Sequence, residues 1–117
     1  PTRRSSDLSS IPEGTFYNCT SLENIVISDF VTSIGEKAFG QCESLVKITI
    51  PASVKRIAYE CFLDCTNLKS ITFTDTTTWY YCGSWLYANG TQISVNTPTL
   101  NATYFTSTYL SKNWYKE

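Results

Sequence analysis

The sequence predicts a repeat solenoid of the α/β type. Short parallel strands would alternate with helical or 3₁₀ return segments, and a β-rich segment would cap the C-terminal end. Three observations predict this fold: the chain repeats with a period of 23 residues over 8–76, apolar residues alternate near the end of each repeat, and residues 77–117 are rich in aromatic side chains. A repeat of this length is typical of stacked coils, which bury their apolar sides against one another.

The repeat is visible when the chain is written in three blocks of 23 from Leu8: LSSIPEGTFYNCTSLENIVISDF, VTSIGEKAFGQCESLVKITIPAS and VKRIAYECFLDCTNLKSITFTDT. Eight columns hold residues of the same kind in all three blocks. They are Leu8/Val31/Val54, Ile11/Ile34/Ile57, Phe16/Phe39/Phe62, Cys19/Cys42/Cys65, Ser21/Ser44/Asn67, Leu22/Leu45/Leu68, Ile25/Ile48/Ile71 and Ile27/Ile50/Phe73. We therefore expect residues 8–76 to form three coils.

The end of each block predicts a short strand. LENIVI, LVKITI and LKSITF share the Leu-x-x-Ile-x-Ile pattern of a leucine-rich repeat. Because side chains alternate along a strand, Ile25 and Ile27 face one side, while Asn24 and Val26 face the other. The return segment, such as SIGEKAFGQC at 33–42, would carry Ile34 inward through a turn and a helical or 3₁₀ piece.

The recurring cysteine of each block predicts a structural ladder. Cys19, Cys42 and Cys65 occupy one column, and free cysteine is among the most buried residue types. Two alternatives are a disulfide and a thiolate metal or catalytic site, but a three-membered ladder makes a poor disulfide framework and the chain has no Cys-x-x-Cys. Pairing of Cys61 or Cys65 with Cys82 stays open.

Composition narrows the classes of function. The chain has 117 residues, a formal net charge of −1 and no histidine. The balanced charge gives no attraction to nucleic acid, and no apolar run is long enough to cross a bilayer. Without histidine there is no Ser-His or Cys-His nucleophile and no His-containing zinc site. We expect no catalytic residue, no metal, no cofactor, no nucleic-acid partner and no membrane insertion.

The two ends of the chain differ from the repeat. The opening PTRRSSDL resembles a translated sequencing adapter, so we expect residues 1–7 to be an artefactual or disordered tail. Residues 77–117 contain all three tryptophans, Trp79, Trp85 and Trp114. We expect strands at Thr77–Tyr81 and over TQISV (91–95), a turn at Asn89-Gly90, and a helix opened by Thr97-Pro98 over Asn101–Thr106. A cap is favoured over a sugar-stacking platform, because the end of a solenoid must be covered.

One surface stands out as a candidate binding face. Its outward columns would be Asn24/Lys47/Ser70 and Val26/Thr49/Thr72. The solvent side of the strand sheet is the usual binding surface of a curved solenoid. These side chains are small and polar and form no catalytic dyad. With three coils the face is short and would bury roughly several hundred Å², below the size of a stable standard interface.

The pattern Val-x-x-Ile-Gly-x-x-Ala-Phe-x-x-Cys-x-x-Leu-x-x-Ile-x-Ile-Pro at Val31–Pro51 resembles the BspA-like, bacterial-type leucine-rich repeat. Pro12 and Ala58 replace its glycine in the other two blocks, and the aromatic tail is similar to the C-terminal segment of such chains. The resemblance implies a non-catalytic, monomeric protein-binding or adhesion module, the C-terminal end of a longer surface or secreted protein whose signal peptide lies outside this fragment. Host extracellular or microbial surface proteins are the implied partners, ahead of carbohydrate. The alternatives are an attachment domain of a larger enzyme and an intracellular scaffold.

Overall fold

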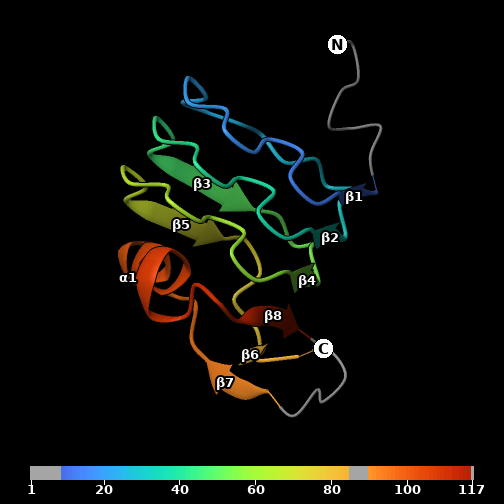
Figure 1. Ribbon diagram of the computed structural model, residues 1–117. Helices are drawn as coiled ribbons and strands as arrows, with labels where there is room; N and C mark the ends of the chain where they lie inside the picture. The colour runs from blue at the N-terminus through green and yellow to red at the C-terminus, as the bar shows by residue number, and fades with distance from the viewer. Residues whose placement is uncertain (1–8, 85–89, 117) are drawn as a thin grey trace.

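The computed structural model describes residues 9–84 and 90–116, and within them three coils stack in sequence order (Figure 1). Along one edge of the coils, β1 (Ser10–Ile11), β2 (Ser33–Ile34) and β4 (Arg56–Ile57) pair in parallel. Along a second edge, β3 (Lys47–Ile50) pairs in parallel with β5 (Ser70–Phe73). In these parallel pairs every residue lies 23 positions from its partner, as in Ile48↔Ile71. The predicted repeat fold is confirmed.

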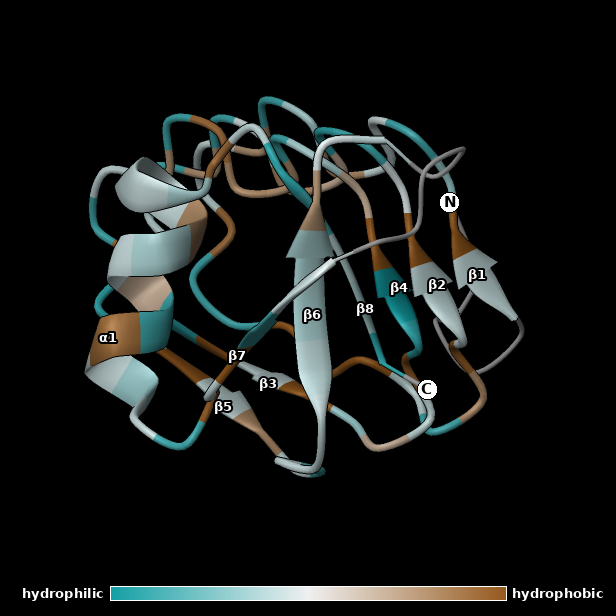
Figure 2. Ribbon diagram, turned by 90° about the horizontal axis from the view of Figure 1, so that it is seen from below, coloured by the Kyte–Doolittle hydropathy of each residue, from teal (hydrophilic) through white to brown (hydrophobic). Residues whose placement is uncertain are grey.

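The C-terminal segment lies against the third coil. It contains β6 (Trp79–Cys82), β7 (Thr91–Ile93), α1 (Pro98–Thr103), a π-helical turn η3 (Tyr104–Thr108) and β8 (Asn113–Lys116). β8 runs antiparallel between β4 and β6, which gives a six-stranded sheet in the order β1-β2-β4-β8-β6-β7. α1 lies alongside β5 (Figures 1 and 2).

The tail differs in detail from its prediction. β6 and β7 occupy the two predicted strand regions, but β6 pairs antiparallel with β7 and β8 and does not extend the parallel stack. The helix begins at Pro98 and not at Asn101, because proline fits the first turn of a helix, where no N–H partner is needed. The adapter-like residues 1–7, Trp85 and the Asn89 half of the Asn89-Gly90 turn lie outside the described residues.

The prediction of helical or 3₁₀ return segments is wrong, because these segments are chains of turns. In the second coil the N–H groups of Ala38, Gly40 and Cys42 donate to carbonyls three residues back. The N–H groups between them donate across to the next coil: Phe39 to the Cys61 carbonyl at 2.9 Å, and Gln41 to the Leu63 carbonyl at 2.6 Å. A helix would use every N–H internally, so coil stacking and helix formation exclude each other here.

Residues in the left-handed conformation enforce the alternation between N–H groups that donate within the coil and N–H groups that donate to the next coil. Lys37 (φ 54°) and Gln41 (φ 57°) interrupt any helical run in the second coil. The same two columns are left-handed in the other coils, at Gly14, Asn18, Glu60 and Asp64. The turn geometry therefore repeats with the 23-residue period even where the residue is not glycine.

The predicted strand of the first coil is also wrong, since the structure assigns no strand to residues 24–27. Ile27 is buried there, whereas Ile25 is only half-buried. On this edge the parallel ladder joins Lys47–Ile50 to Ser70–Phe73. Regular strand geometry on this edge therefore begins with β3.

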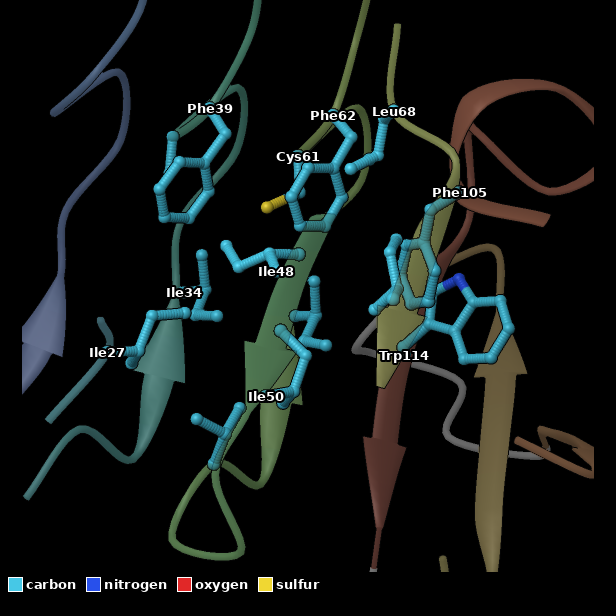
Figure 3. Close-up of a cluster of buried hydrophobic side chains, with 14 of the residues drawn as sticks. Ile27, Ile34, Phe39, Ile48, Ile50, Cys61, Phe62, Leu68, Phe105 and Trp114 are labelled. Carbon is cyan, nitrogen blue, oxygen red and sulfur yellow. The ribbon is translucent and has the colours of Figure 1, made fainter. Parts of the chain in front are cut away.

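The core consists of equivalent side chains stacked from coil to coil. The rings of Phe16 and Phe39 lie 5.3 Å apart at an interplanar angle of 11°, and those of Phe39 and Phe62 lie 5.5 Å apart at 9°. Figure 3 shows Phe39 and Phe62 side by side above the isoleucines of the strands. At the C-terminal end, Phe105 meets Phe62 edge-on at 5.7 Å and stacks on Trp114 at 4.2 Å. Rings of the tail thus continue the core.

We predict that Phe39→Ala lowers the free energy of unfolding by about 3–5 kcal/mol, because it leaves a cavity between two stacked rings. Denaturant unfolding followed by circular dichroism measures the loss. The matched control is Phe30→Ala, since the Phe30 side chain is 69% exposed, and that variant should unfold almost like the unchanged protein. A loss below about 1 kcal/mol for Phe39→Ala would contradict the stacked core.

Gly35 permits the close approach of the first two coils. A Cβ atom at this position would lie 2.5 Å from the Glu13 nitrogen and 2.8 Å from the Pro12 carbonyl carbon. Both are backbone atoms, so neither can rotate away as the end of a flexible side chain would. We predict that Gly35→Ala destabilises the fold by about 1–3 kcal/mol through overpacking. Gly83→Ala is the control, since a Cβ there meets nothing within 4 Å; equal effects of the two substitutions on the melting temperature would refute the steric explanation.

Candidate functional site

The six residues predicted as a binding face come together in one place. β3 and β5 bury alternate side chains, so Ile48 and Ile71 point into the core while Thr49 and Thr72 are exposed. Together with Lys47, Ser70 and the first-coil residues Asn24 and Val26, the two threonines line one shallow hollow of about 350 Å³. We call this surface the strand-face hollow. It spans all three coils, because each coil contributes two of the six residues.

The strand-face hollow has a mostly polar lining. Its lining includes one cation, Lys47, together with hydroxyl and amide groups and no carboxylate. Val26, at its first-coil end, has 82% of its side chain exposed. Hydroxyl and amide groups both donate and accept hydrogen bonds, and a lysine ammonium attracts a carboxylate. An extended peptide segment of a partner protein offers matching groups.

The cysteine column forms a ladder of thiols. The Cys42 thiol donates to the Phe16 carbonyl at 3.3 Å, and the Cys65 thiol donates to the Phe39 carbonyl at 2.9 Å. Cys19 is half-buried at the first-coil end of this ladder. All five cysteines lie in the described ranges and all are free thiols, so Cys61 and Cys65 are not bonded to Cys82 in this structure.

Burial holds these thiols in the protonated form. It raises the pKa of Cys42 to about 11 and that of Cys65 to about 12, and it raises the pKa of Cys61 well above its usual value. Since the thiolate is the nucleophile and the metal ligand, the three groups are poorly suited to either chemistry at neutral pH. Within residues 9–84 and 90–116, no cluster of three or more Cys, Asp or Glu side chains is arranged to hold a metal.

The aromatic tail is packed inward. Trp79 and Trp114 are 1% and 0% exposed, and the Tyr81 ring stacks on Tyr109 at 4.2 Å. A sugar platform needs the open face of a ring, and neither of these tryptophans offers one. The third tryptophan, Trp85, is outside the described residues.

An ion pair that sequence analysis missed joins the tail to the end of the third coil. Lys116 Nζ lies 2.7 Å from Asp75 Oδ2 and also donates to the Ala52 carbonyl. The hydrogen bond from Lys116, together with two from Thr77, holds the pKa of the Asp75 carboxyl well below its usual range. Because Asp75 and Lys116 are 41 positions apart and outside any repeat column, periodicity could not connect them.

No helix among the described residues combines the length and the apolar character needed to cross a membrane.

Comparison with known proteins supports a leucine-rich repeat fold. The family model described as the BspA type leucine rich repeat region matches residues 3–113 in six copies. The chain is also similar to a leucine-rich repeat protein from Bacteroides ovatus ATCC 8483, known from a crystal structure, with 44% identity and a TM-score of 0.53. That similarity covers 54% of this chain and 16% of the other chain, so the region corresponds to a small part of the longer protein. No curated protein matches the chain.

The buried thiols predict a loss of stability at high pH. The ordinary pKa of a thiol is 9.0. Below that pH, Cys42 is protonated in both the folded and the unfolded chain, so its burial contributes fully to the free energy of unfolding. As the pH rises from 9 toward 11, the unfolded thiol ionises while the folded thiol stays protonated, so the free energy of unfolding falls, by about 2 kcal/mol for this group. Denaturant unfolding between pH 8 and 11 should show a smaller fall for Cys42→Ala than for the unchanged chain. Thr49→Ala, which removes no ionisable group, serves as control, and parallel pH curves for all three proteins would contradict the prediction.

Proposed function

Since this chain belongs to the BspA-type leucine-rich repeat family, we propose that it is a non-catalytic adhesion module that binds other proteins through the strand-face hollow. Leucine-rich repeats generally mediate protein–protein interaction and are generally non-catalytic. The partners proposed here are host extracellular proteins or surface proteins of other microbial cells. The proposed location is extracellular or at the cell surface.

The observation that carries this proposal is the gathering of six outward side chains from three coils in one hollow. The inward columns of the same strands are occupied by core residues, so they are unavailable to a partner. The outward columns differ from coil to coil: Asn24, Lys47 and Ser70 share one column but have different chemistry. A surface of this kind distinguishes partners by hydrogen bonds and by one positive charge.

The proposed organisation is a solenoid end. Residues 8–76 are three coils, residues 77–117 are their cap, and the whole is the C-terminal end of a longer protein. Its similarity to 16% of the Bacteroides protein supports this organisation. Three coils present less than the roughly 1,200 Å² of a stable standard interface. The affinity of this region alone is therefore weak, and neighbouring coils of the longer protein supply the remaining contacts.

Two alternative functions would use the same hollow but differ in what the rest of the longer protein does. In one, this region attaches a larger enzyme to its target; in the other, it is part of an intracellular scaffold. Carbohydrate binding is less favoured, because the described tryptophans are buried in the tail. No contact or distance in the described residues favours any of these over adhesion.

We predict that Thr49→Arg weakens binding at least about tenfold, because a long cationic side chain would fill the centre of the hollow. Surface plasmon resonance of the monomeric chain over immobilised extracellular-matrix proteins, and binding to whole bacterial cells, measure the effect. Thr99→Arg is the matched control, since Thr99 is exposed on α1 and does not line the hollow. Equal binding by the two variants would show that the hollow is not the binding face.

A further inference from the structure

The polar side chains of the strand-face hollow make no hydrogen bonds within the described part of the chain. Five side chains share this property: Asn24, Lys47, Thr49, Ser70 and Thr72. Polar side chains on the turns behave differently. The Thr32 hydroxyl donates to the Ser9 carbonyl at 3.0 Å, for example, and the Asn67 amide donates to the Glu43 carbonyl at 2.6 Å. The hydroxyl, amide and ammonium groups of the hollow are therefore available to a partner.

Lys47 brings to the hollow a positive charge that no described side chain pairs with. No described carboxylate lies within 4.0 Å of its ammonium group, whereas the Lys37 ammonium lies 3.9 Å from Glu60. Glu23 and Glu43 lie close to the lining residues in sequence, but neither lines the hollow. An incoming segment therefore meets one positive charge and no negative charge in the lining.

β3 and β5 place hydroxyl groups beside this charge. Lys47 pairs with Ser70 in the parallel ladder, so the two side chains leave the same face from backbones about 4.8 Å apart. Thr49 follows two residues later on β3 and is exposed on that face. One ammonium and two hydroxyls can donate together to the oxygens of one carboxylate, which accepts hydrogen bonds and donates none.

We infer that the strand-face hollow selects protein segments that carry a carboxylate side chain, and that Lys47 is the residue that determines this selection. The inference rests on the proposed function, and it deepens that proposal by naming the chemistry of the partner.

Other partners match these groups less well. A lysine ammonium has three donors and no acceptor, so a neutral or basic segment would cover the charge of Lys47 without compensating it, at a cost in free energy. A sulfated polysaccharide carries many negative charges, and the lining includes one cation to meet them. A single carboxylate of a protein segment corresponds to that single cation.

Panning of a random library of short peptides, displayed on yeast, against the bead-bound full chain tests the partner chemistry. The same library is panned against Lys47→Glu and against the matched control Lys55→Glu. Lys55 is exposed, its replacement changes the charge by the same amount, and it does not line the hollow. A further variant, Thr49→Gln combined with Thr72→Gln, fills the hollow with longer neutral side chains.

We expect the unchanged chain and Lys55→Glu to enrich peptides with an excess of Asp and Glu, and Lys47→Glu to enrich peptides with an excess of Lys and Arg. One enriched peptide is then compared with its amide counterpart by fluorescence anisotropy. The amide counterpart should bind the unchanged chain about fivefold more weakly, the upper end of the range for an exposed ion pair. Lys47→Gln should bind the two peptides equally, and this double-mutant cycle assigns the preference to Lys47.

The outcomes separate this inference from the proposed function. Peptides that lack an acidic excess, but are lost when the hollow is filled, would overturn the inference and leave the binding face in place. So would an acidic excess that Lys47→Glu retains. A heparin fragment that binds the unchanged chain more tightly than the enriched peptides, and loses binding in Lys47→Glu, would also overturn it by assigning the hollow to a polysaccharide. Equal enrichment by the filled-hollow variant, or no enrichment at all, would count against the binding face and the inference together.

Discussion

The structure depends on one constraint: in the return segments of the first two coils, alternate backbone N–H groups donate to the following coil and not to their own. Phe39 donates to the Cys61 carbonyl and Gln41 to the Leu63 carbonyl. Once these groups are committed, the segment cannot be a helix, and left-handed residues such as Gln41 are needed to turn the intervening peptide units outward. The same bonds fix the register between neighbouring coils at one 23-residue repeat. Ring columns, isoleucine columns and thiol columns align because the backbone ladder aligns them.

Periodicity alone could predict the contacts that repeat. Residues that recur every 23 positions must stack if the coils stack, and Ile48↔Ile71 and the phenylalanine column follow directly. The outward columns, and with them the candidate face, follow from strand alternation. The turn geometry could not be predicted, because Lys37 and Glu60 adopt left-handed conformations that their side chains do not favour. The ion pair of Asp75 with Lys116 was equally hidden, since it joins single positions that do not recur.

The tail shows how an irregular segment can complete a regular stack. The Asn101 side chain donates to the carbonyls of Ile71 and Val95, and so an amide group takes the place of a strand beside β5. Phe105 and Trp114 continue the ring column, with the edge-on approach of Phe105 to Phe62 ending the parallel stack. None of these contacts of the tail depends on the 23-residue period. A terminal segment has to satisfy only one face, so its chemistry is free to differ from the coils that it covers.

Inward and outward positions have different roles. Inward side chains stabilise the fold, and outward side chains form the proposed binding face. Stacking dictates the inward columns, where a substitution is transmitted to two neighbouring coils at once. It places no such demand on the outward columns, and these vary between coils: Val26, Thr49 and Thr72 share one column yet differ in polarity. In the proposed binding mode, recognition depends on the order in which coils with different outward residues are stacked, and not on any single coil. The three coils stack in sequence order, so that order is the order of the repeats along the chain.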